Sequence, residues 1–226
     1  WYASFWEFSA RYAASRFGQD WHLSPEQSLL LHAQNTAIPT RVVVYSHNGT
    51  GNPANLPFQT SLYDLKTSAM PPATDLTTIH DLRVYTTAAA LVKLQESFFQ
   101  RFPIEAQVAL SAIGDSSALL APLLEGGHPY IAGRLAGALR RVGRTAIADD
   151  IVVGMKAADF VVRESDPFDA HQRVHDFSAY SPIVARIRAL WAAFREPVLA
   201  LAPATPGLPD DKAAYLKAVD DIYKSD

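Results

Sequence analysis

The stretch Arg41-Val42-Val43-Val44-Tyr45-Ser46 decides the fold class of this chain, because its β-branched residues interrupt a helical pattern and are typical of a strand. Residues 60–66 and 82–86 have the same strand-like character. Residues 47–57, between the first two strands, are rich in turn formers and predict a loop. Together these stretches predict a small sheet of three or four strands, antiparallel or mixed.

Helices are predicted before this sheet. A helix over residues 2–17, which Gly18 can end, would gather four aromatic side chains roughly on one side: Phe5, Trp6, Phe8 and Tyr12. Ser24-Pro25-Glu26-Gln27 is a capping box with proline at the first helical position, so it predicts a second, short helix that ends near Asn35.

Helices dominate again from Thr87, a plausible N-cap for residues 88–95. Start and stop signals predict further helices at 103–113, after Asp115, at 129–142 and at 145–158. A short strand is predicted at 160–163, irregular chain from Asp166, a long helix from Ser181, a linker at 202–209 and a last helix near 212–224. The predicted fold is therefore α+β, a small mixed or antiparallel sheet followed by a predominantly helical region. Its expected divisions are 1–86, 87–168 and 169–226.

Composition excludes several classes of protein. The chain has 226 residues, a net charge of −3 and no cysteine, so disulfides, thiolate zinc sites and a cysteine nucleophile are excluded. No apolar run approaches the roughly 18–20 residues that span a bilayer, so no membrane contact is expected. The first residues lack an initiator methionine and the layout of a secretory signal, so we expect a cytoplasmic segment of a longer polypeptide.

Four arginines are the candidate contacts for a partner or for phosphate groups. On the helix predicted at 129–142, Arg134 and Arg141 share one face, and Arg140 shares an adjacent face with Arg144. Such a basic surface could hold phosphates or an acidic partner. The alternative is a solvated helix face, with arginines near its C-terminus favoured by the helix dipole.

Three other patterns suggest chemistry but each is incomplete. The segment from His128 begins like the catalytic motif H-x-F-x-(D/E)-G-N-x-R-x-x-R of Fic-domain proteins, but Ala132 and Arg134 replace its acidic and Asn positions. His171 and His175 have a metal-binding spacing without the glutamate of H-E-x-x-H, so surface histidines are expected. Asp64-Leu65-Lys66 is similar to the acidic-x-Lys element of restriction-type nucleases but lacks a companion acid on a preceding strand. We therefore expect no catalytic residue, no metal site and no enzyme activity in this segment alone.

Several segments resemble the non-catalytic N-terminal region of bacterial Fic-family proteins. They are residues 20–33, 126–144, 162–168 and 215–226. Residues 24–144 are also similar to the body of type IV abortive-infection antitoxins, the AbiEi family. The resemblance implies a parent protein with a DNA-binding winged helix upstream and, downstream, a Fic domain that transfers AMP from ATP with magnesium.

The function expected from this resemblance is regulation and interaction without catalysis. The partner would be the downstream Fic domain or another protein, with DNA reached through the upstream winged helix, and homo-oligomers are left open. No cofactor is expected in this segment itself. The alternative is a stand-alone, antitoxin-like, DNA-associated transcriptional regulator.

Overall fold

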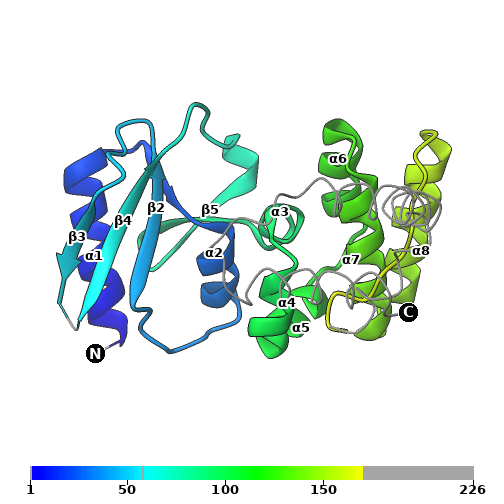
Figure 1. The fold of residues 1–226 in the computed structure, drawn as a ribbon, viewed down its shortest axis with the longest axis horizontal. Coiled ribbons are helices and arrows are strands. Elements are labelled where there is room, and N and C mark those ends of the chain that lie inside the picture. The colour runs from blue at the N-terminus through cyan, green and yellow to red at the C-terminus, as the bar shows by residue number, and fades with distance from the viewer. Residues whose placement is uncertain (1, 58, 170–226) are drawn as a thin grey trace, which may run out of the picture. The chain divides into compact units, whose positions relative to one another are not determined.

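The computed structural model describes residues 2–57 and 59–169, and all that follows concerns this part of the chain (Figure 1). The chain divides into two compact units, 1–170 and 171–226, and the described residues belong to the first. The helices predicted from Ser181 onward, the linker at 202–209 and the pair His171 and His175 lie outside the described residues. The fold is α+β, as the sequence predicts: the strands lie in the first half and helices fill the second.

A four-stranded mixed sheet is built on β2 (Arg41–Ser46). This strand pairs antiparallel with β1 (Trp21–Leu23) and parallel with β4 (Thr60–Lys66), and β3 (Pro53–Leu56) extends β4 antiparallel at the far edge. A separate antiparallel hairpin joins β5 (Leu76–Ile79) to β6 (Leu82–Tyr85). The prediction of a small mixed sheet is confirmed.

Three of the strands, β1, β3 and β5, are not predicted by the sequence pattern. β3 falls inside the predicted loop 47–57, where Pro53 and Asn55 are poor strand formers. Pro53 is tolerated because it is the first residue of an edge strand, where no ladder donor is required of it. Pairing with β4 therefore creates this strand, and local propensity does not.

The first helix, α1 (Tyr2–Phe17), ends as predicted at Gly18, whose φ of +66° suits a residue without a side chain. Phe5 and Trp6 are buried with Phe17 in a hydrophobic cluster that includes residues of the sheet. Phe8 is 41% exposed and stacks on Tyr12, with ring centroids 6.1 Å apart. Phe8 lies at the exposed edge of this aromatic group, because α1 buries a face centred on its small residues Ser9, Ala10 and Ala13.

The helix α2 (Pro25–His32) starts at the predicted cap, where Ser24 Oγ accepts a hydrogen bond from the Gln27 amide at 3.2 Å. The second half of the capping box differs from the prediction. The Gln27 side chain turns to β2, donating to the Arg41 carbonyl at 2.6 Å and accepting from the Val43 amide at 2.9 Å. Gln27 therefore joins the helix to the sheet.

Six helices follow in the described chain: α3 (Thr87–Lys93), α4 (Ser97–Arg101), α5 (Pro103–Ser111), α6 (Ser117–Gly126), α7 (Pro129–Arg141) and α8 (Thr145–Ala157). Only α4 is unpredicted. The N-cap of α3 is Thr86 rather than Thr87, with its hydroxyl accepting from the Ala89 amide at 3.3 Å. None of the helices in this part of the chain has the length and apolar character that a bilayer crossing requires.

Two hydrophobic clusters hold the described chain together. One lies around α1 and the strands, and the other fills the helical array around Phe98, Phe99 and Leu110. α2 contributes to both, with Leu29 in the helical cluster and Leu31 in the other. A change in α2 is therefore expected to affect both halves.

Candidate functional site

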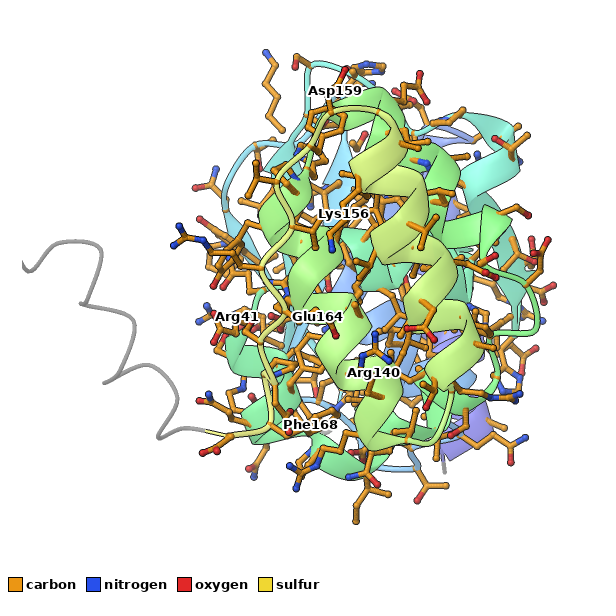
Figure 2. The ribbon with its side chains drawn as sticks, turned by 90° about the vertical axis from the view of Figure 1, so that its right-hand side faces the viewer. Arg41, Arg140, Lys156, Asp159, Glu164 and Phe168 are labelled. Carbon is orange, nitrogen blue, oxygen red and sulfur yellow. The ribbon has the colours of Figure 1, made fainter. Side chains whose placement is uncertain are left out.

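An extended segment packs along α7 and covers the helix that carries the candidate arginines. Residues 160–168, here called the strap, follow α8 and run back along α7 toward Phe168 (Figure 2). The strand predicted at 160–163 is wrong, because these residues belong to no strand. The strap bonds to α7 through its backbone, with the Ser165 amide donating to the Gly133 carbonyl at 3.3 Å.

Two glycines on α7 make this approach possible. A side-chain carbon added at Gly133 would collide with the Arg163 carbonyl, and one added at Gly137 would collide with the Ser165 carbonyl. The two positions are four residues apart, so they form one continuous stripe along the helix. The close neighbour of both glycines is therefore the backbone of the strap.

Arg140 joins α7 to both of its neighbours. Its guanidinium donates from Nε to Glu164 of the strap at 2.6 Å, and from Nη2 to Asp149 of α8, also at 2.6 Å. These hydrogen bonds, first the one to Glu164, raise the pKa of Arg140 above its ordinary value. Figure 2 shows Arg140 and Glu164 side by side between the helix and the strap.

Arg141 and Arg144 also donate within the chain. Arg141 donates to Asp166 of the strap at 2.7 Å, and its guanidinium lies 5.4 Å from the centre of the Phe168 ring. Asp166 in turn accepts from the Phe168 amide at 2.9 Å, so the end of the strap folds around this pair. Arg144 donates to the carbonyl oxygen of Ser111, at the end of α5.

Arg134 occupies a different environment, because it is buried, with 5% of its surface exposed. Its Nη2 donates to the Leu94 carbonyl at 2.7 Å, and the guanidinium lies 5.7 Å from the Phe99 ring centre and 6.0 Å from that of Tyr130. Burial lowers the pKa of Arg134. The four arginines therefore do not form one exposed basic surface in the described chain. Contact of these residues with a partner stays a prediction.

His128 lies where the sequence places it, directly before α7, but its side chain makes no capping hydrogen bond. It lines a groove together with Lys93, Glu96, Glu125 and Arg134, between α3, α6 and α7. Sequence reasoning finds Arg134 alone among these charged residues. Gly126-Gly127 marks the end of α6, where Gly127 is the left-handed C-cap, and the sequence carries no local signal for the groove.

Asp64 is fully buried on the inward face of β4, in line with Leu62. Its carboxylate accepts from Arg16 of α1 at 3.0 Å and from the Thr50 hydroxyl at 3.1 Å. Bonds to Tyr12, and then the charge of Asp64, raise the pKa of Arg16. The partners of Asp64 are thus a cation and a hydroxyl, and within the described residues no cluster of three or more His, Asp or Glu side chains could hold a metal ion.

Comparisons of this chain with models of known protein families, with curated proteins and with solved structures found no match.

Proposed function

We propose that this chain is a regulatory and interaction region, similar to type IV antitoxins, that positions or restrains an adenylyl-transferring Fic domain encoded downstream. The observation that supports the proposal is the strap. Two segments that resemble Fic-family proteins, residues 126–144 and 162–168, are distant in sequence but pack against each other. A regulatory region that positions a downstream domain must fix the place where the connecting chain leaves it. A strap anchored along a helix fixes this place more closely than a flexible linker does.

The anchoring relies on two kinds of contact with different strengths. The ion pairs of Arg140 and Arg141 lie near the surface and are screened by solvent. The backbone contacts at Gly133 and Gly137 include the hydrogen bond from the Ser165 amide to the Gly133 carbonyl, and they require that no side chain stands between α7 and the strap. Substitution at the glycines is therefore the sharper way to release the strap.

The test begins with the reading frame around this segment and then uses the full-length protein. An intact Fic motif downstream is required. In that protein, Gly137→Ala should change AMP transfer from ATP to protein several-fold, while the control Gly154→Ala in α8 should leave it unchanged. The nearest atoms to an added carbon at Gly154 belong to the Leu120 side chain, which can move, and not to backbone.

Two results would reject the proposal. One is a reading frame without a Fic motif. The other is equal AMP transfer by the protein with and without Gly137→Ala, once the strap is known to be displaced. A reading frame that ends soon after this segment and carries a winged helix upstream would instead favour the DNA-associated regulator.

A further inference from the structure

A large groove lies between α3, α6 and the start of α7. Its volume is about 730 Å³, within the range of about 300–1,000 Å³ common for small-molecule sites. Much of the lining is apolar, contributed by six residues: Pro72, Ala89, Val92, Leu94, Pro122 and Ile131. The groove is thus large enough for a small molecule and has walls that favour an apolar body.

Arg134 makes the groove unusual, because it is a buried cation that forms no ion pair with any described carboxylate. Its Nη2 is bonded to the Leu94 carbonyl, but its Nε is buried with no hydrogen-bond partner in the described chain. A guanidinium keeps its charge under ordinary conditions, and the negative charge of Glu96 favours the charged form of Arg134. The buried Nε–H without an acceptor is still destabilising. The stacking on Phe99 and Tyr130 explains how the side chain is held, but it gives Nε no acceptor.

The start of α7 favours an anion at the same place. α7 is a 13-residue helix whose N-cap residue, His128, supplies no capping hydrogen bond, and both His128 and Ile131 line the groove. The first amides of a helix are unpaired donors and carry the positive end of its dipole. The helix start and Arg134 therefore present two independent sources of positive potential to the groove.

The remaining charges limit what the anion can be. Among the described lining residues, Asp75, Glu96 and Glu125 are acidic, whereas Lys93 and Arg134 are basic. Glu96 is engaged with the Tyr130 hydroxyl at 2.7 Å. A doubly charged phosphate would meet more negative than positive side chains. A ligand that carries one carboxylate and one ammonium group can pair its carboxylate with the basic lining residues and its ammonium group with the acidic ones.

We propose that this groove binds a small zwitterion with an apolar body, such as an apolar amino acid or dipeptide. Its carboxylate lies at Arg134 and the start of α7, and its ammonium group faces Asp75 and Glu125. This inference does not depend on the proposed relationship to Fic proteins.

The experiment measures binding to the 226-residue protein by calorimetry with four probes. Leucine and leucyl-leucine carry both charges, N-acetylleucine lacks the ammonium group, and inorganic phosphate is the competing anion. At least one zwitterion should bind saturably, and N-acetylleucine and phosphate should bind more weakly. The absence of saturable zwitterion binding up to about 10 mM, where even a weak site is occupied, would overturn the proposal, as would tighter binding of phosphate.

Variants then assign the two ends of the ligand. Arg134→Lys keeps the charge but loses the planar donors, and should weaken zwitterion binding roughly ten- to hundredfold. Glu125→Gln lies on the exposed surface, leaves the core untouched, and should weaken zwitterion binding up to about fivefold without affecting N-acetylleucine. Glu7→Gln on α1 is the matched control and should leave binding unchanged. Equal zwitterion affinity in Glu125→Gln and Glu7→Gln would reject the proposed orientation, even if Arg134→Lys fails to fold.

Discussion

Replacing Gly137 by alanine is expected to destabilise the protein, because the new methyl group collides with the backbone of the strap, which can move only if the neighbouring strap residues move with it. The added carbon would collide with the carbonyl oxygen of Ser165 in the strap. Alanine is a better helix former than glycine by about 1 kcal/mol, so an alanine in open space would stabilise α7. Overpacking against a fixed neighbour costs about 1–3 kcal/mol. The free energy of unfolding of Gly137→Ala should therefore be lower than that of the unmodified protein by about 0–2 kcal/mol.

A comparison with Gly154→Ala removes the helix-propensity contribution. Both glycines lie inside helices, but at Gly154 the new methyl meets the flexible end of Leu120. Gly137→Ala should therefore be less stable than Gly154→Ala by about 1–3 kcal/mol, measured as the free energy of unfolding in urea. The Ser165 amide, which donates to Gly133, should also exchange its hydrogen faster in Gly137→Ala.

The double variant Gly133→Ala with Gly137→Ala provides an internal check. Both methyl groups displace the same strap, so the second substitution should lower the free energy of unfolding by less than it does as a single substitution. The losses of the two single variants should therefore not add up to that of the double variant. Equal stability of Gly137→Ala and Gly154→Ala, with the Ser165 amide equally protected in both, would refute the role of the glycines in seating the strap.

Three further perturbations test other parts of the structure. Gln27→Ala leaves the Val43 amide without its acceptor and should lower the free energy of unfolding by about 1–3 kcal/mol in a urea titration; an unchanged midpoint would show that the Gln27 bridge is dispensable. Burial lowers the pKa of His22 below its ordinary 6.5, so the unfolded chain binds the proton more readily. The stability from neutral His22 should be complete above pH 6.5 and be lost as the pH falls through the lower folded pKa, and His22→Gln should flatten that dependence in urea titrations across pH. Asp64→Ala leaves the Thr50 hydroxyl and Arg16 without their shared acceptor and should lower the thermal midpoint, with a loss of about 1–3 kcal/mol; a midpoint unaffected by this change would mean that the buried carboxylate contributes little.

Helix ends could be predicted from sequence because their signals are local. Gly18 and Gly143 both adopt positive φ where the sequence places the end of a helix, and Pro103 and Pro129 both begin one. Each signal acts within a single turn, through the backbone freedom of glycine or the fixed φ of proline. Strand β3 had no such signal, since it depends on hydrogen bonds to β4, several residues farther along the chain.

The sequence predicts which arginines share a face of α7. It does not predict which groups pack over that face at each position along the helix. Arg134 and Arg141 are seven residues apart, so they point in nearly the same direction at heights about 10 Å apart along α7. At the level of Arg134 the covering group is the Leu94 carbonyl, and at the level of Arg141 it is Asp166 of the strap. Periodicity fixes the direction of a side chain, whereas its burial depends on segments distant in sequence. One arginine is therefore buried in a groove while the other forms an ion pair nearer the surface.

The same reasoning explains why α7 can serve two purposes without conflict between them. Gly133 and Gly137 belong to the stripe that seats the strap, whereas Arg134 is turned about 100° from Gly133 and lines the groove. The strap packs closely only against small residues, and the groove carries a charged one. The neighbouring residues Gly133 and Arg134 can meet these two requirements because they lie on different faces of the helix. Because a helix moves as a unit, displacement of the strap and occupation of the groove would both act on the position of α7. If the groove ligand binds more tightly when the strap is packed on α7, then release of the strap would weaken ligand binding by the same factor by which the ligand stabilises the packed strap.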